Sequence, residues 1–381
     1  MIPNVGVGVL VGVKLLSDVI MNYYFKLVFR AFKIGVAFNL FTLFLIVTYT
    51  LLVEYYFRPF QFSFNPLVEF GTAVSGMKIF NTSDPKNHTL RPAWSKIEPQ
   101  FSLFIPEFQL RADWKEPSPR LDNWCKTRNC CAHRIAFDDR RIPDFKCFTL
   151  DDWYLSNRDF LGSQFDSSVV STLDTFLFNL PRGSRIIINE HYLLFSNPKS
   201  FDDFTSWFLI LASKHPGLRF EIGIQVHLQW IDAYWWQYHH WLIPALGQFG
   251  RRHRVRWGIT EFSIYHRLWK PRVAYAGATP PDMRLLDRFE QLIPDRFLRA
   301  VVAHQSYIFH CDALRSGASH FVQWGNFPTT WFAASIDPQY TSTFELYDWD
   351  GNPQLMYWAI MRALAVDKIN TVNSVRQRKT P

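Results

Sequence analysis

The chain carries many basic residues but gathers few of them together. Its net charge is +8 over 381 residues, yet lysine and arginine are scattered along the sequence. The basic tail Arg376–Lys379 is short, which is typical of a solvated end rather than of a nucleic-acid-binding arm. Charged residues make up 19% of the chain and hydrophobic residues 48%, so the sequence can supply one extended apolar core.

Cysteine is also scarce. Four of the five cysteines, Cys125, Cys130, Cys131 and Cys147, lie close together. Their spacing does not match a zinc site, and no histidine pair accompanies them at ligand distance. We expect them to form two disulfides in an oxidising compartment, within a stretch that has little regular structure. The remaining Cys311 is expected to be a buried thiol.

Charge is absent altogether from residues 34–53. About 20 apolar residues are enough for a helix to cross the hydrocarbon core of a bilayer. Lys26, Arg30 and Lys33 precede this run. The positive-inside rule therefore predicts a cytoplasmic N-terminus, with the large C-terminal part outside the cell or in a lumen.

An uncleaved anchor is favoured over a cleaved signal peptide, whose apolar core is usually shorter and nearer the start. A helix buried in the core is the alternative. The predicted organisation is a cytoplasmic segment (1–33), a transmembrane signal anchor (34–57) and one large domain (58–381). Acceptor triplets for glycosylation begin at Asn81 and Asn87, which agrees with a lumenal or extracellular domain.

From about residue 183 the sequence alternates short β-rich runs with longer amphipathic stretches. Arg185–Ile188 is largely a continuous apolar run, which is typical of a parallel strand covered on both faces. Such alternation indicates βαβ units, and four units in a row suit a closed barrel at least as well as an open sheet. The expected strands are 185–188, 220–224, 255–260 and 320–324, and the expected helices are 202–214, 236–249, one or two within 287–315, and 353–364.

Polar residues favour the barrel over the open sheet. Each of the four expected strands has a hydrogen-bonding or stacking residue at its C-terminal end. In a barrel these ends converge on one active-site mouth. The residues concerned are Asn189 and Glu190, Gln225 and His227, Glu261, and Trp324.

Five segments in this half resemble glycoside hydrolase family 10, the xylanase family. They are similar to its fifth-, sixth-, seventh- and eighth-strand motifs and to its closing stretch. The segments are Ile188–Tyr192, Ile222–Leu228, Trp257–Ile264, Phe321–Trp331 and Leu346–Ala359. The resemblance implies a (β/α)8 TIM barrel and a retaining hydrolase that cuts β-linked, xylan-like polysaccharides.

The N-terminal half is less similar to that family. Phe70–Val74 resembles the first strand of the barrel, Phe101–Arg111 the second, and Pro143–Phe145 the end of the third. Between that point and Arg185 the chain lacks the family's Asn-Glu pair, which carries the catalytic acid/base. This region is shorter than in the family by about a helix and a strand, so we expect a barrel shortened around strands three and four.

A retaining glycosidase needs two carboxyl groups, one as nucleophile and one as acid and then base. The resemblance makes Glu261 the nucleophile, where the usual alternative for a glutamate on a strand is a surface ion pair. His227 could hydrogen-bond this carboxylate and favour its ionised form. The nearest candidate for the acid/base is Asp152, after the short expected strand 147–152. A helix cap is the alternative role for Asp152.

Substrate-binding residues follow from the same resemblance. Indole faces stack on sugar rings, so Trp324 and Trp331 are expected to be platforms for the glycan. Arg111 stands where the family has a lysine that contacts sugar. The other expected contacts are Glu107, Asn189, Gln225 and His227. No metal, cofactor or nucleic acid is expected, and the expected partners are a β-linked polysaccharide or oligosaccharide and a membrane.

Three functions remain open from the sequence. The first is a membrane-anchored β-glycan hydrolase, and the second is an inactive barrel that binds glycans behind the same anchor. The third is a type II membrane glycosyltransferase, which shares the anchor and the disulfides. That enzyme would need an acidic metal-binding motif, for which Asp151–Asp152 and Asp348–Asp350 are the candidates.

Overall fold

The chain forms two compact units, Met1–Tyr56 and Phe57–Pro381. The computed structural model describes residues 33, 35–63, 65–74, 92–106, 123–134, 145–151, 154, 167–191, 198–229, 241–265, 293–324, 346–348 and 350–365.

The first unit contains a 22-residue helix, Gly35–Tyr56. Its mean hydropathy is 2.2, and large apolar side chains such as Phe38 and Phe44 are more than 60% exposed. By length and composition this helix can cross a membrane. A signal sequence near an N-terminus meets the same criteria, so the side of the membrane on which the second unit lies stays a prediction.

The second unit is built on a sheet of eight strands, and every pair of neighbours is parallel. The spatial order is β2-β1-β8-β7-β6-β5-β4-β3. Backbone bonds from Phe104 N to Asn129 O (2.9 Å) and from Cys131 N to Phe104 O (2.8 Å) join the two ends of this order. The strands are β1 (Glu69–Val74), β2 (Leu103–Pro106), β3 (Ala132–Arg134), β4 (Cys147–Asp151), β5 (Arg185–His191), β6 (Arg219–Gln229), β7 (Arg256–Tyr265) and β8 (His320–Gln323).

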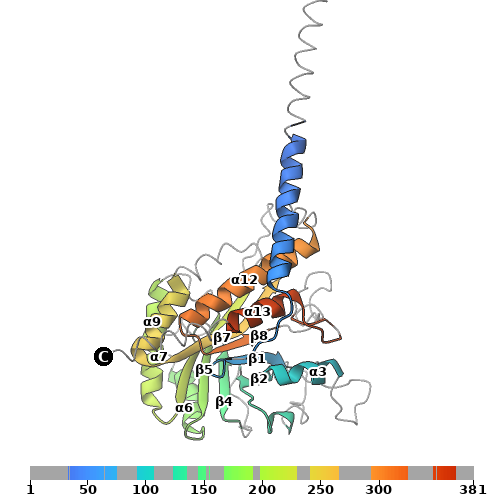
Figure 1. Ribbon diagram of the computed structural model, residues 1–381. Coiled ribbons are helices and arrows are strands. Elements are labelled where there is room, and N and C mark those ends of the chain that lie inside the picture. The colour runs from blue at the N-terminus through green and yellow to red at the C-terminus, as the bar shows by residue number, and fades with distance from the viewer. Residues whose placement is uncertain are drawn as a thin grey trace, which may run out of the picture. The chain divides into compact units, whose positions relative to one another are not determined.

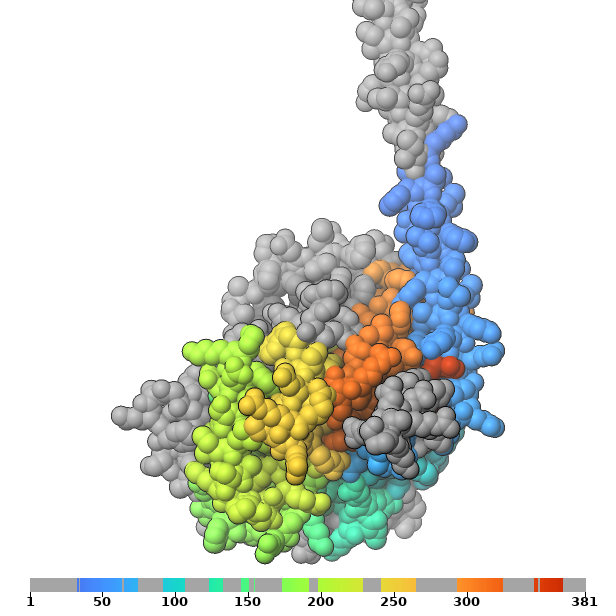
Figure 2. Space-filling view, turned by 60° about the vertical axis from the view of Figure 1, so that its left-hand side comes forward, coloured from blue at the N-terminus to red at the C-terminus, as the bar shows by residue number. Residues whose placement is uncertain are grey.

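Helices cover the outer face of the sheet (Figure 1). On one side of the surface, α7, α9 and α12 form neighbouring bands (green, yellow and orange in Figure 2). The predicted (β/α)8 barrel is therefore confirmed. The helical elements are α3 (Pro92–Ile97), the short 3₁₀ helix η1 (Glu98–Gln100), α6 (Ser167–Phe178), α7 (Pro198–Lys214), α9 (Ile243–His253), α12 (Asp295–Arg315) and α13 (Leu355–Ala365).

Strand β5 shows why its sequence is apolar at consecutive positions. Ile186 and Ile188 are fully buried in the large cluster between sheet and helices. Ile187, between them, is fully buried in a small cluster inside the barrel with residues of β2 and β8. Because successive side chains of a strand point to opposite faces, a strand buried on both faces must be apolar at each step.

The third strand lies earlier than the sequence motif indicated. Pro143–Phe145 was expected to end strand three, but β3 is Ala132–Arg134 and β4 begins at Cys147. The link between these two strands has 12 residues and is the shortest between consecutive strands. All eight strands are present, so the shortening of the chain falls on the connections. The short motif at residues 143–145 did not locate the third strand correctly. The strand itself has only three residues, so its sequence carries little signal.

The clustered cysteines form two disulfides, as predicted, in the pairs Cys125–Cys130 and Cys131–Cys147. Cys311 is a buried free thiol, which is also confirmed. The expected setting was wrong for one pair. Cys131 and Cys147 belong to the apolar cluster inside the barrel and link the start of β3 to the start of β4.

Candidate active site

Strand β7 is irregular at the point where it carries Glu261. The β6–β7 ladder pairs Ile224 with Ile259 and then Gln225 with Glu261, so Thr260 is an extra residue on β7. An extra residue of this kind is a β-bulge, which changes the direction of the side chains that follow. Here the bulge leaves Thr260 and Glu261 both buried on the inner side of the sheet, facing β5 and β6.

Both carboxylate oxygens of Glu261 have a hydrogen-bonding partner on a neighbouring strand. The side-chain amide of Asn189 on β5 donates to Oε1 at 2.8 Å. Nε2 of His227 on β6 lies 3.1 Å from Oε2. The Glu261 residue is 5% exposed. Hydrogen bonds to the ionised form of a buried carboxylate stabilise that form and fix its orientation.

Each of these two partners is in turn contacted by a hydroxyl group from β7. Thr260 Oγ1 donates a short hydrogen bond to Oδ1 of Asn189. Ser263 Oγ lies 2.7 Å from Nδ1 of His227. The result is a polar chain of five side chains centred on one carboxylate, of which four are buried and His227 is partly exposed.

The other sequence-predicted residues divide into three groups. Gln225 is 5% exposed and pairs in register with Glu261, and Trp324 is 7% exposed directly after β8.

Glu190 was expected at the mouth of the barrel, and this prediction is wrong. It is fully buried, it pairs in register with Ile224 of the outer cluster, and its Oε1 accepts the Tyr154 N–H at 2.7 Å. Four predicted residues lie outside the described residues: Glu107, Arg111, Asp152 and Trp331.

Three residues of this region were missed by the sequence reasoning. The period-2 alternation of β5 places His191 on the same face as Asn189, and its ring centroid lies 6.1 Å from that of His227. Thr260 and Ser263 flank Glu261 on β7, so the same motif contained them. Their roles depend on partners from two other strands, which the motif does not reveal.

The sequence matches no protein-family model and no curated protein. The structure resembles solved endoxylanases of glycoside hydrolase family 10. One was retrieved from a sugarcane soil metagenome; it has a TM-score of 0.56 at 13% identity, over 77% of this chain and 97% of that one. Another is a thermostable mutant of the xylanase Xyn10A from Cellvibrio japonicus, with a TM-score of 0.50 at 10% identity, over 78% and 98% of the two chains. The barrel has a family 10 fold.

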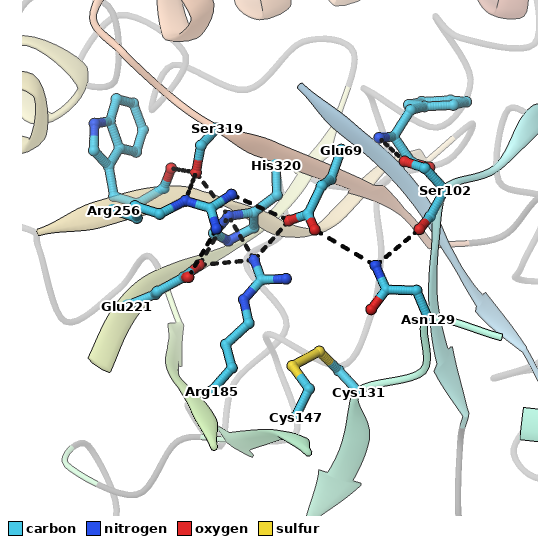
Figure 3. Close-up of polar contacts among 12 residues, drawn as sticks. Glu69, Ser102, Asn129, Cys131, Cys147, Arg185, Glu221, Arg256, Ser319 and His320 are labelled. Carbon is cyan, nitrogen blue, oxygen red and sulfur yellow. Dashed lines mark hydrogen bonds and ion pairs between the residues drawn. A yellow bond between two sulfur atoms is a disulfide. The ribbon is translucent and has the colours of Figure 1, made fainter. Parts of the chain in front are cut away.

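The opposite, N-terminal end of this family 10-like barrel holds a cluster of charged side chains, which we call the basal cluster (Figure 3). Arg185 Nη2 reaches Glu221 Oε2 at 2.7 Å and Glu69 Oε2 at 2.8 Å. Arg256 binds the same two carboxylates, at 3.1 Å and 3.3 Å. Because β1 and β5 stand four strands apart in the barrel, Arg185 bridges its opposite walls. The cluster consists of Glu69, Arg185, Glu221, Arg256 and His320.

His320 is the neutral member of the basal cluster. Its side chain is fully buried, and Nδ1 lies 3.4 Å from Arg185 Nη2 and 3.2 Å from Ser319 Oγ. Burial, followed by the two neighbouring arginines, holds the pKa of His320 well below its usual range. The ring packs over Gly258, where a Cβ atom would overlap it. The two arginines are therefore balanced by two glutamates, with His320 uncharged.

The acidic segment Asp348–Asp350, which precedes α13, contains a turn that Asp348 stabilises. Asp348 Oδ1 accepts the backbone N–H groups of Asp350 (3.0 Å) and Asn352 (2.7 Å), and Oδ2 accepts the Asn352 side-chain amide. These bonds lower the pKa of Asp348. The carboxylate is thus engaged in the turn that precedes α13. Among the described residues, no group of three or more His, Cys, Asp or Glu side chains is placed to hold a metal ion.

Proposed function

We propose that this protein is a membrane-anchored, retaining glycoside hydrolase that cleaves a β-linked, xylan-like polysaccharide, with Glu261 as the nucleophile. The observation that carries the proposal is the arrangement around Glu261. A buried carboxylate lies toward the C-terminal end of a barrel strand, and each oxygen has a hydrogen-bonding partner. In TIM-barrel enzymes that end of the strands forms the active site.

The chemistry of a retaining glycosidase accounts for this arrangement. A carboxylate that attacks the anomeric carbon must be ionised and correctly oriented. The partners Asn189 and His227 contact one carboxylate oxygen each and leave the carboxylate few orientations. Gln225 and Trp324, on the adjacent strands, are proposed to contact the sugar together with Glu107, Arg111 and Trp331.

The second carboxyl group is proposed to be Asp152. Strand β4 ends at Asp151, which pairs with Asn189 across the β4–β5 ladder. Asp152 is the next residue along the chain, and its candidacy rests on this place directly after β4 in the sequence. The role proposed for Asp152 is to protonate the leaving oxygen and then to activate water.

A mechanism-based label tests the nucleophile. A 2-fluoro xyloside with a dinitrophenyl leaving group needs little protonation, so it probes Glu261 even when the acid/base is weak. We expect a covalent adduct on the peptide that contains Glu261, found by mass spectrometry, and no adduct on Glu261→Gln. A protein that binds xylo-oligosaccharides but never forms the adduct would instead be a glycan-binding barrel.

The acid/base is tested by the dependence on leaving group. Asp152→Asn should slow the first step with xylan strongly and the first step with dinitrophenyl xyloside little, measured as kcat/KM and as the initial release of dinitrophenolate, because only the poor leaving group needs a proton in that step. Asp151→Asn is the matched control. If both substrates slow equally in Asp152→Asn, or if Asp151→Asn shows the leaving-group effect, Asp152 is not the acid/base.

The membrane topology is tested separately. We propose a cytoplasmic segment 1–33, a membrane anchor 34–57 and a catalytic domain 58–381 on the other side. In sealed vesicles with the cytosolic side outward, a C-terminal tag should resist added protease until detergent is present. Digestion of the tag in sealed vesicles would reverse the proposed orientation.

A further inference from the structure

The two side chains that contact Glu261 can each present either a donor or an acceptor. An asparagine amide can turn by 180° and exchange its NH₂ group with its oxygen, and a neutral imidazole carries its proton on either nitrogen. An ionised carboxylate only accepts hydrogen bonds. If Asn189 presented its oxygen, or His227 its bare Nε2, each would repel Glu261.

A hydroxyl from β7 lies against the far polar atom of each partner, Oδ1 of Asn189 and Nδ1 of His227. Thr260 donates to Asn189 Oδ1, which leaves the Asn189 NH₂ group to face Glu261 Oε1. Ser263 Oγ lies 2.7 Å from His227 Nδ1. A hydroxyl that donates to Nδ1 leaves the proton on Nε2, which then donates to Glu261 Oε2. Thr260 and Ser263 are both fully buried, while His227 is partly exposed.

A glycine on the strand between them makes the first of these contacts possible. Thr260 is on β7 and Asn189 on β5, so the threonine side chain must lie across β6. There it lies over Gly223, which pairs in register with Asn189. A Cβ atom at Gly223 would lie 2.5 Å from Thr260 Cγ2 and 2.8 Å from Ile187 Cγ2. The bulge at Thr260 and the missing side chain at Gly223 thus act together.

We propose that Thr260 and Ser263 are positioning residues that set the hydrogen-bonding direction of Asn189 and His227 toward Glu261. This inference rests on the proposed nucleophilic role of Glu261. In this arrangement Ser263 donates to Nδ1 of His227, and Nε2 carries the proton that faces Glu261. Neither hydroxyl touches the substrate, and each acts through the side chain that it orients.

The kinetic test compares substitutions that remove or retain each hydroxyl. Thr260→Val keeps the shape of the side chain, and Ser263→Ala removes one atom. Each should slow labelling by the 2-fluoro xyloside about 10-fold to 100-fold, since small errors of position carry penalties of this size. Thr260→Ser and Ser263→Thr should restore most of the rate.

Thr149→Val is the matched control for the loss of a buried threonine hydroxyl. Thr149 is fully buried on β4, and its hydroxyl lies 3.5 Å from the Ala132 carbonyl oxygen. Its labelling rate should equal that of the unmodified protein. If Thr260→Val also labels at that rate with an unchanged melting temperature, the positioning role of Thr260 is wrong.

A spectroscopic test does not depend on activity. In protein labelled with ¹⁵N-histidine, the His227 signals are identified by their loss in His227→Gln. At neutral pH we expect a protonated Nε2 and an unprotonated Nδ1, and in Ser263→Ala a mixture of the two tautomers. A His227 protonated on both nitrogens, or unaffected by Ser263→Ala, would overturn the proposal. The expected tautomer without any labelling of Glu261 would retain the positioning role and reject the hydrolase.

Discussion

Each end of the barrel contains a buried glutamate, and the two glutamates have different kinds of partner. At the N-terminal end, Glu221 lies within 3.1 Å of the guanidinium groups of both Arg185 and Arg256. Toward the C-terminal end, the described partners of Glu261 are an amide and an imidazole. Both side chains are about 5% exposed. Burial alone therefore does not distinguish the two carboxylates, and the difference lies in their partners.

The difference in partners suits Glu221 to a role in stability and Glu261 to a role in reaction. A carboxylate neutralised by two guanidinium groups is a poor nucleophile, and its removal leaves both arginines sharing the single carboxylate of Glu69 in the basal cluster. A carboxylate oriented by an amide and an imidazole can serve as a nucleophile. In TIM barrels the N-terminal end typically serves stability and the C-terminal end catalysis. The following predictions test whether that division holds in this protein.

The largest effect is expected from Glu261→Gln. This change keeps the shape of the side chain and removes its charge, so xylan hydrolysis should fall by roughly 10³-fold or more. The thermal midpoint should change little, because the glutamine can still bond to Asn189. A reducing-sugar assay and a melting curve on the full chain in detergent give the two values. Full activity in Glu261→Gln would reject the nucleophile.

The reciprocal change at the basal cluster is Glu221→Gln. It removes one of the two carboxylates of the network, so the free energy of unfolding should fall by up to about 3–5 kcal/mol. Glu69 still pairs with both arginines and Arg256 is half exposed, which lowers the loss. Chemical denaturation measures this loss, and the turnover per folded molecule should stay the same. A loss of turnover without a loss of stability would contradict the division between the two ends.

Removal of the interior disulfide should have a smaller effect. In Cys131→Ala with Cys147→Ala, a cross-link over 16 residues is lost, which corresponds to about 3 kcal/mol in the chain-entropy estimate. The shorter Cys125–Cys130 link spans 5 residues and gives the matched control, with an expected loss of about 2 kcal/mol. Equal losses for the two pairs would mean that loop length does not determine their contribution.

The smallest effect, for each histidine and each pH unit, is expected from a fall in pH. Burial lowers the pKa of His310 to about 4, and the pKa of His320 also lies well below 6.5. As the pH falls below 6.5, the unfolded chain binds protons that the folded protein does not. The free energy of unfolding should therefore fall by up to about 1.4 kcal/mol per pH unit for each histidine.

His310→Phe tests this linkage, because the ring packs against Phe262 and Phe321. Denaturation curves between pH 6.5 and pH 4.5 should show a shallower loss of stability in the variant. An unchanged slope would remove His310 as a source of the acid sensitivity.

Much of the fold was predictable from local sequence. The expected strands at 185–188, 220–224, 255–260 and 320–324 all lie within or largely overlap β5 to β8, and apolar runs buried on both faces produced this signal. The N-terminal half was harder, since β2 and β3 have only four and three residues. Strands this short contain too few positions for a reliable pattern.

The sequence by itself determined the helix long and apolar enough to cross a membrane, the barrel class, the clustered cysteines and Glu261 as a candidate, because each depends on neighbours along the chain. Only the tertiary structure decided that Glu190 is excluded from the mouth, while Thr260 and Gly223 bring β7 to Asn189. The tertiary structure also placed a disulfide inside the barrel and paired Arg185 with Glu69 across its N-terminal end. These contacts link strands far apart in sequence, so their geometry exists only once the barrel has closed.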